Sequence, residues 1–296
     1  MTVYYPVYYK DFRCIADECK HSCCLGWEIQ VDDDALKNYE RIGREDILCH
    51  IQNSEIALTD DGRCPFLDKD GLCRIISSLG EKYVSEICRE HPRFYNEVCG
   101  RVECGIGASC EEACRIILTS DGYRDMYSAV TEEKEPAYSS DFDTLCHREY
   151  IYSVLSDGAL SYSDKIARIK ERYGISEPIH TPSEWVNILS ELEYLEQSHR
   201  DIFNIGGSPI DCEAEKLCER FLAYLIFRHV SVAENYVNLR SRLGFCLLMC
   251  SVLDNFLAEE RSFAETVEFV RILSEEIEYS EENTQSLIFE YECYLN

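Results

Sequence analysis

Cysteine is the residue whose number and spacing in this sequence point most directly to chemistry. The chain has 296 residues and 18 cysteines, and twelve of these cysteines lie between Cys14 and Cys114. Four thiols fall in the eleven residues from Cys14 to Cys24. Because thiolates are favoured ligands of zinc and of iron–sulfur clusters, a segment so rich in thiols predicts a soft metal centre.

Three further groups of thiols follow the first one along the chain. Cys64 and Cys73 enclose a turn that contains Asp70-Gly71, and separate motifs surround Cys88 and Cys110. A single pair of this kind would be weak evidence. Four groups in the first 115 residues favour a metal centre over disulfides or simple core packing.

Whether these thiols form disulfides or bind a metal depends on the cellular compartment of the protein. The first ten residues contain no basic segment followed by an apolar one, so no secretory signal is expected. The longest apolar run, Leu243 to Leu257, is interrupted by Asp254 and Asn255 and is too short to span a bilayer. We therefore expect a cytoplasmic protein without a membrane span, in which thiols stay reduced and disulfides are rare.

The charge of the chain excludes other classes of protein. It has 29 Lys and Arg residues against 56 Asp and Glu residues, a formal net charge of −27. Neutralising nucleic-acid phosphates requires a basic surface, so no nucleic-acid partner is expected. The acidic balance is compatible with attracting a positively charged surface, although solubility is the simpler explanation.

The elements that must position the thiols divide the chain into two predicted domains. Residues 1–120 are cysteine-rich and turn-rich, residues 121–144 read as an acidic connection, and residues 145–296 carry helical patterns. The predicted fold class is therefore mainly α: an N-terminal cysteine-rich, turn-rich metal-binding domain followed by an α-helical bundle.

Helix boundaries are marked clearly in the second domain. Capping boxes at Thr181–Glu184 and Ser262–Glu265 predict helix starts, and Ser161 to Gly174 has a serine start and a glycine stop. The more apolar stretches 213–230 and 239–257 predict the buried helices of a bundle. Because free cysteine behaves as a small hydrophobe, we expect the six later cysteines to be core residues: Cys146, Cys212, Cys218, Cys246, Cys250 and Cys293.

The motifs of the first domain carry a resemblance to a known family. Their order is Phe12-x-Cys14, Cys19-x₃-Cys23-Cys24-x-Gly-Trp27-x-Ile29, Cys64-Pro-Phe-Leu-Asp68, Gly71-Leu-Cys73-x-Ile75, Leu79-Gly-Glu81, Cys88-x₃-Pro-Arg93 and Ser109-Cys110-x-Glu112-Ala113. This pattern, which covers residues 5–118, resembles the flagellin lysine-N-methylase family. That family belongs to a wider group of cysteine-cluster proteins associated with zinc or iron.

The resemblance implies an enzyme, its cofactors and its substrate. It implies methyl transfer from S-adenosylmethionine to the ε-amine of surface lysines on flagellin, with a [4Fe–4S] cluster in the enzyme and zinc as the alternative metal. The metal ligands that it implies are eight thiols: Cys14, Cys19, Cys23, Cys24, Cys64, Cys73, Cys88 and Cys110.

The ligand count leaves alternatives open. One cluster uses at most four cysteines, so either a second metal site exists or some of the eight thiols are structural. His21 and His91 lie inside the cysteine motifs and are alternative ligands. Four cysteines fall outside the motifs and have no predicted role: Cys49, Cys99, Cys104 and Cys114.

The reaction itself needs a base and a donor pocket. Lysine is protonated at neutral pH, so its proton must be lost before the amine attacks a methyl group. Glu103, between Val102 and Cys104, is the predicted catalytic carboxylate, with Asp68 and Glu112 as alternatives. A solvated surface acid remains the simpler interpretation of each of these three carboxylates.

The sequence does not assign a donor pocket. Gly105-Ile-Gly107 is a weak candidate, and a turn or a close backbone approach is the better interpretation of these glycines. Cys23 and Cys24 are adjacent, which is not the Cys-x₃-Cys-x₂-Cys spacing associated with radical chemistry. Two alternatives to the methyltransferase remain: a non-enzymatic zinc- or iron-binding adaptor, and a redox iron–sulfur protein.

Overall fold

The computed structural model describes residues 1–27, 29–130, 142–175, 178–206 and 210–295, and these residues form two compact units. We call the first the helical unit; it consists of Met1–Phe12, Tyr95–Ser109 and Ala113–Asn296. We call the second the cysteine unit; it consists of Arg13–Phe94 and Cys110–Glu112. Each unit is described by itself.

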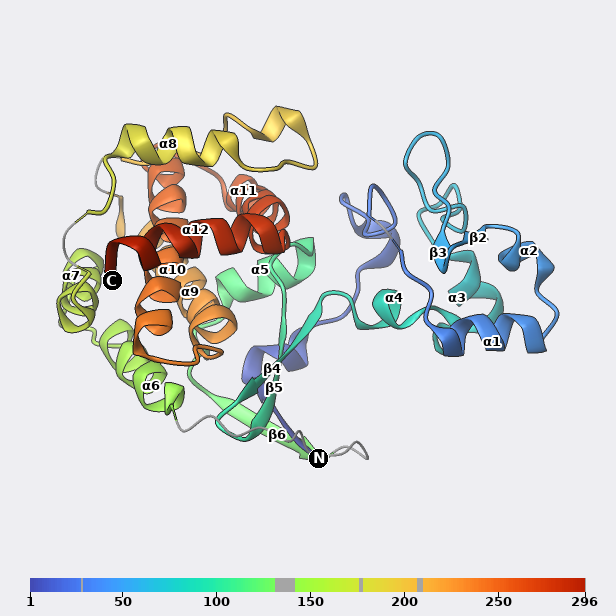
Figure 1. The fold of residues 1–296 in the computed structure, drawn as a ribbon, viewed down its shortest axis with the longest axis horizontal. Helices are drawn as coiled ribbons and strands as arrows, with labels where there is room; N and C mark the ends of the chain where they lie inside the picture. Colours follow the sequence, from blue (N-terminus) through green and yellow to red (C-terminus); the bar gives the residue numbers. More distant parts are fainter. Residues whose placement is uncertain (28, 131–141, 176–177, 207–209, 296) are drawn as a thin grey trace. The chain divides into compact units, whose positions relative to one another are not determined.

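The helical unit is dominated by α-helices, as predicted (Figure 1). Their bounds are α5 Glu111–Thr119, α6 Thr144–Leu155, α7 Tyr162–Tyr173, α8 Pro182–Glu191, α9 Cys212–Leu225, α10 Tyr236–Leu257, α11 Phe263–Leu273 and α12 Glu281–Leu295. The first two residues of α5 are counted with the cysteine unit. Shorter turns of helix are η1 Val7–Asp11, η4 Gln197–His199, and the π-helical turns η5 Ile226–Val230 and η6 Ser274–Glu278.

The predicted helix boundaries are confirmed. The Thr181–Glu184 and Ser262–Glu265 capping boxes both form, and they start α8 and α11. Ser161 caps the start of α7 and Gly174 ends it in the left-handed conformation, with φ of 64°. The capping residues in the sequence therefore predicted the boundaries of these helices correctly.

The core of the helical unit is built around α10, which packs against α9, α11 and α12. Among the cysteines predicted to be core residues, Cys218, Cys246 and Cys250 are buried. For Cys146, Cys212 and Cys293 the prediction was wrong, because these cysteines are exposed. All three lie in the first or last turn of a helix, where a side chain faces solvent more readily than in the middle of a buried helix. No helix in the described part of the chain combines the length and apolarity needed to cross a membrane.

Gly244 lets α12 lie close against α10. A β-carbon at this position would overlap the ring of Tyr291. We expect Gly244→Ala to lower the free energy of unfolding by about 1–3 kcal/mol, because overpacking outweighs the better helix propensity of alanine. Thermal unfolding followed by circular dichroism would measure the change.

Gly158→Ala is the control for this prediction, since nothing lies within 4 Å of a β-carbon built there. Its effect is expected to stay within about 0.5 kcal/mol. A stabilised Gly244→Ala variant would contradict the close approach of the two helices.

The helical unit also contains a four-stranded sheet that the sequence did not predict, of strand order β4-β5-β1-β6. β1 is parallel to β5 and antiparallel to β6. Positive φ angles at Cys99 and Gly100 form the tight turn between β4 and β5. The strand bounds are β1 Thr2–Pro6, β4 Arg93–Val98, β5 Arg101–Ile106 and β6 Met126–Val130, and the first two residues of β4 are counted with the cysteine unit.

The units differ from the predicted domains 1–120 and 145–296. Residues 2–6 and 101–106 belong with the helices because they pair in one sheet, which also includes residues 126–130 from the predicted connection 121–144. Residues 131–141 of that connection lie outside the described residues.

The cysteine unit consists of short elements joined by turns (Figure 1). It has its own apolar core, which includes Tyr39, Ile47, Phe66 and Val84 and takes in the thiol of Cys64. Its elements are η2 Ala16–Glu18, α1 Asp33–Arg41, α2 Glu45–Leu48, β2 Ile51–Gln52, β3 Glu55–Ile56, α3 Arg74–Leu79, η3 Glu81–Tyr83 and α4 Glu86–Glu90.

Candidate metal centre

The eight predicted metal ligands all lie in the cysteine unit. Of the four cysteines outside the motifs, only Cys49 lies there, and it is exposed with its thiol directed at the Asp46 carbonyl oxygen. Cys99, Cys104 and Cys114 belong to the helical unit, where the last two are buried. The division of the chain thus separates the motif thiols from three of the four extra ones.

Two chain segments meet at Cys24 and Cys64. The Cys64 backbone N–H donates to the Cys24 carbonyl oxygen at 2.8 Å, and the Gly26 N–H donates to the Gly62 carbonyl oxygen at 2.9 Å. This pairing places thiols from distant positions in the sequence side by side. The order of the motifs could not reveal it, because the pairing is made by the backbone.

The thiol of Cys24 interacts with the thiols of both Cys23 and Cys64. Hydrogen bonds from the thiols of Cys23 and Cys64 lower the pKa of Cys24 to about 3, although burial acts in the opposite direction. The same hydrogen bonds are the largest cause of the raised pKa values of Cys23 and Cys64. Cys24 is therefore the thiol of this group that most readily becomes a thiolate, which is the form that binds metals.

The loop from Cys64 to Cys73 folds back on itself, so that the two cysteines lie at its two ends. Cys73 forms a bridge with Leu67, and the Arg74 N–H donates to the Phe66 carbonyl oxygen at 2.8 Å. At the tip, Asp68 Oδ1 accepts from the backbone N–H groups of residues 70 and 72, each at 2.9 Å. Asp68, one of the alternative bases, thus has a structural task in holding the turn.

Cys88 and His91, in the third cysteine motif, are two further candidate ligands. The Ser85 hydroxyl donates to Cys88 Sγ at 3.2 Å. Removal of the Cys88 thiol from water raises its pKa, and the negative charge of Cys24 raises it further. Burial lowers the pKa of His91 to about 4, against the influence of the Cys24 thiolate. A neutral imidazole of this kind has the protonation state of a metal ligand.

The segment 110–112 is joined to the first cysteine loop through Glu111. Its carboxylate accepts from the Lys20 backbone N–H at 2.8 Å and lies 3.8 Å from Cys19 Sγ. Burial is the largest cause of the raised pKa of Cys19, and the charge of Cys14 adds to it. The charge of Cys14 also raises the pKa of Cys23. The thiols of the first three groups thus influence one another, and Glu111 joins the segment 110–112 to the first of these groups.

The donor chemistry of this cluster fits a soft metal centre, since it offers a thiolate surrounded by further thiols and a neutral imidazole. Among the described residues, no three Cys, His, Asp or Glu side chains together have the geometry of a metal-ion site. The case for a metal centre is therefore the gathering of the thiols and the charge state of Cys24.

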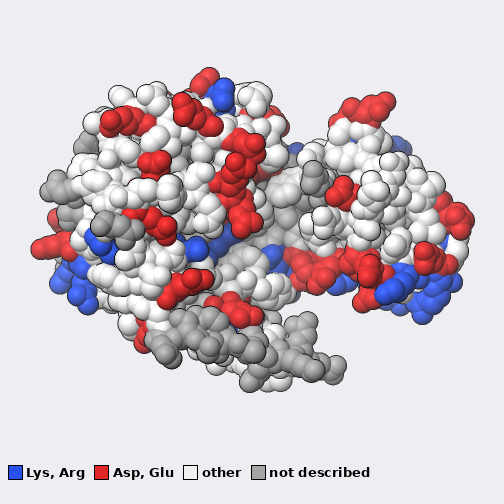
Figure 2. Space-filling model, in the orientation of Figure 1, with Lys and Arg blue, Asp and Glu red and all other residues white. Residues whose placement is uncertain are grey.

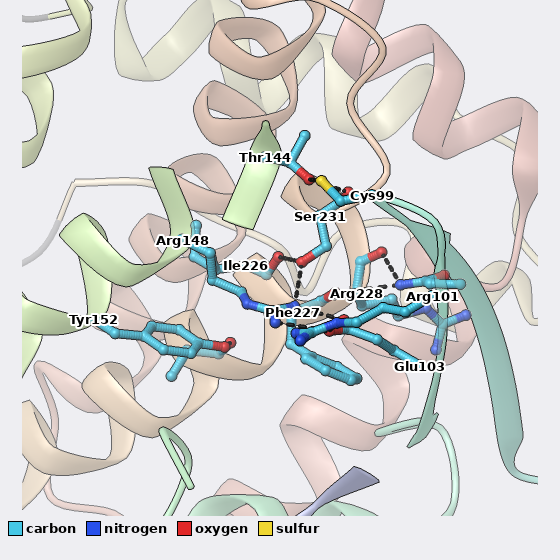
Figure 3. A network of polar contacts seen from close by, with 12 residues as sticks. Cys99, Arg101, Glu103, Thr144, Arg148, Tyr152, Ile226, Phe227, Arg228 and Ser231 are labelled. Carbon is cyan, nitrogen blue, oxygen red and sulfur yellow. Dashed lines mark hydrogen bonds and ion pairs between the residues drawn. The ribbon is translucent and has the colours of Figure 1, made fainter. Parts of the chain in front are cut away.

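Glu103, the predicted catalytic carboxylate, lies in the helical unit and not in the cysteine unit. It is fully buried, and its oxygens accept from Arg101 Nε at 2.9 Å and from the Arg148 guanidinium at 2.6 and 2.8 Å (Figure 3). Arg148 also donates to the Ser231 hydroxyl at 2.8 Å. Two arginines hold this carboxylate, an arrangement typical of a structural ion pair, and its role as a base stays a prediction.

Gly107, from the glycine-rich candidate for donor binding, is explained by packing. A β-carbon there would overlap the Tyr279 hydroxyl, and the Arg228 guanidinium would lie within 2.8 Å. This close backbone approach agrees with the packing alternative for Gly105-Ile-Gly107.

The cysteine unit also has a surface cavity that the sequence did not predict. It has a volume of about 380 Å³ and is lined by Gln30, Val31, Asp32, Asn53, Ser54, Glu86 and Ile87. Asp32 precedes the helix α1, and an aspartate in that position is typical of a helix cap. Such a pattern carries no information about a cavity.

Acidic side chains are spread over the face of the helical unit shown in Figure 2. This distribution matches the net charge of −27. It gives a positively charged partner a favourable electrostatic field at low ionic strength.

Comparison with known proteins gives three informative relatives. The flagellar biosynthetic protein FliU of Salmonella muenchen is 31% identical over 131 residues, which cover 40% of this chain and 78% of FliU. Lysine-N-methylases of Salmonella choleraesuis (strain SC-B67) and Salmonella typhimurium (strain LT2) are also 31% identical over 131 residues, again 40% of this chain. The chain matches only 33% of the length of each methylase. No family model and no solved structure matches the chain.

Proposed function

Because the chain belongs to the lysine-N-methylase family, we propose that it transfers methyl groups to the ε-amines of protein lysines. The similarity to the named methylases supports this activity. The acceptor that we propose is flagellin, encountered in the cytoplasm before export. The name of the flagellar relative, FliU, supports that choice of substrate.

We propose S-adenosylmethionine as the methyl donor. Its sulfonium group is an intrinsically reactive carrier, so the protein has to supply alignment and a deprotonated amine. The acidic surface of the helical unit supports the arrival of a lysine-bearing substrate. None of these tasks requires a covalent intermediate on the protein.

The proposed metal centre is a [4Fe–4S] cluster, with zinc as the alternative, held by thiols of the cysteine unit. The observation that carries this part is the presence of all eight motif cysteines in that unit, around a Cys24 thiolate. Cys23, Cys24 and Cys64 are its central candidates, because the thiols of Cys23 and Cys64 both interact with that of Cys24. When bound, such a centre would supply a rigid scaffold or a Lewis-acid anchor for polar groups of the donor.

The test combines metal analysis with a transfer assay. Protein purified without oxygen is analysed for iron, sulfide and zinc, and is then incubated with flagellin and methyl-labelled S-adenosylmethionine. We expect label on flagellin lysines, located by peptide mass spectrometry. Flagellin with acetylated lysines is the control and should take up none.

Two results would contradict the proposal in different ways. Metal-loaded protein that transfers no label to any lysine would overturn the methylase assignment and favour the redox or adaptor alternatives. Label transfer by protein that holds neither iron nor zinc would keep the enzyme and remove the metal centre.

A further inference from the structure

The surface cavity of the cysteine unit, which we call the Asp32 cavity, is held open by three backbone segments. The Val31 N–H donates to the Ser54 carbonyl oxygen at 2.7 Å, and Gln30 forms a bridge with Glu55. Asn53 and Ser54 have left-handed backbone conformations, with φ of 51° and 64°. Its volume of about 380 Å³ lies in the range of small-ligand sites, about 300–1,000 Å³.

Asp32 fastens the third segment to the other two. Its Oδ1 accepts from the Ala35 N–H at 2.9 Å and caps α1, while its Oδ2 accepts from the Glu86 N–H at 2.7 Å. Partial burial acts to raise the pKa of Asp32, but these backbone hydrogen bonds lower it overall. The cavity therefore contains a fixed carboxylate that is charged at neutral pH.

The lining combines one kind of charge with apolar surface. Asp32 and Glu86 are acidic, Val31 and Ile87 are apolar, and the other three lining side chains are neutral and polar. The lining includes no lysine, arginine or histidine. Within the described part of the chain, neither carboxylate forms an ion pair. Such a lining suits an alkyl chain that ends in a cation.

The cavity also lies beside the candidate metal centre, inside the same unit. Its wall residues Glu86 and Ile87 immediately precede Cys88 in α4. The charge of Asp32 also contributes to the raised pKa of the Cys88 thiol.

We infer that the Asp32 cavity binds the side chain of a substrate lysine, with its methylenes against Val31 and Ile87 and its ammonium group at the carboxylates of Asp32 and Glu86. This inference rests on the proposed lysine methylation and adds the residues that first capture the acceptor in its ammonium form, before the proton is lost. An ammonium ion hydrogen-bonded to carboxylates gains more than a neutral group does, so the cavity discriminates lysine from an apolar side chain of equal length.

The test is a binding measurement that requires neither metal nor methyl donor. The full chain is titrated with the peptide acetyl-Gly-Lys-Gly-amide and, separately, with acetyl-Gly-norleucine-Gly-amide, and backbone amide signals are followed by NMR. We expect the lysine peptide to shift the signals of the cavity residues, and the norleucine peptide to leave them in place. The affinity should fall as salt is added, because the contact is between charges at the surface.

Two variants remove charge with little change of shape. Asp32→Asn keeps one oxygen to cap α1 but loses the acceptor of the Glu86 N–H, so Glu86→Gln is the variant that removes charge without altering these backbone contacts. Glu86→Gln removes the second charge. Each is expected to weaken binding of the lysine peptide about fivefold to tenfold. Asp33→Asn, in the exposed first turn of the same helix, is the matched control and should bind as the parent protein does.

Equal shifts with both peptides would overturn the inference, as would Asp32→Asn and Glu86→Gln variants that bind like the Asp33→Asn control. The outcome is separable from the proposed function. Selective lysine binding without label transfer would retain the cavity and remove the methylase, whereas label transfer with unselective binding would do the reverse.

Discussion

Replacing Cys24 by serine is expected to reduce the metal content of the purified protein to near zero. Cys24 is the thiol whose pKa is lowered to about 3, and the thiols of Cys23 and Cys64 both donate to it. Serine keeps the size of the side chain, but its hydroxyl is not ionised at neutral pH and is a poor ligand for iron or zinc. Iron, sulfide and zinc analysis after anaerobic purification, together with visible absorption, measures the loss.

Cys49→Ser provides the matched control for this experiment. Cys49 lies in the same unit, but it is exposed and outside the motifs. This variant should retain the full metal content, and near-ultraviolet circular dichroism should show that both variants are folded. A Cys24→Ser protein with unchanged metal content and colour would remove Cys24 from the set of ligands.

The second large effect is expected at Arg148, in the network of Figure 3. Arg148→Met removes the guanidinium that lies 2.6 Å from the fully buried carboxylate of Glu103. Breaking a buried ion pair on one side leaves a charge that has lost part of its compensation, so we expect the free energy of unfolding to fall by about 3 kcal/mol. Urea unfolding followed by the helical circular dichroism signal gives this value.

Two comparisons separate the ion pair from other effects of the substitution. Arg168→Met removes an exposed arginine that lies 4.0 Å from Asp157, and its effect should stay below about 1 kcal/mol. The double variant Glu103→Leu/Arg148→Met should be more stable than Arg148→Met alone, because no buried carboxylate remains. A single Arg148 variant as stable as the parent protein would show that Arg101 alone satisfies Glu103.

The helices and the cysteine motifs could be predicted because their signals are local. Thr181 and Ser262 bond to residues three positions ahead, and a capping box is visible in any four-residue window. The thiols of Cys64 and Cys73 are likewise nine residues apart in a single turn. Where a contact joins residues a few positions apart, the sequence pattern is sufficient to predict the local structure.

The sheet and the position of Glu103 depend on long-range pairing and could not be predicted in this way. Val3 pairs with Val102, and Thr2 pairs with Val130. The presence of cysteine next to Glu103 in sequence suggested a place near the metal centre. Its partner Arg148 is 45 residues away, and it keeps Glu103 among the helices.

The pairing of β1 has a consequence for the order in which the chain is assembled during synthesis. β1 is made first, but it pairs with β5 and β6, which end at residues 106 and 130. Residues 13–94 of the cysteine unit are therefore complete before β1 finds either neighbour. At about 5–20 residues per second, the ribosome leaves those thiols several seconds in which to gather before the sheet closes. Cys110 is the last of the eight to emerge, so the cysteine unit is completed only after both strands of the β4–β5 hairpin have been made.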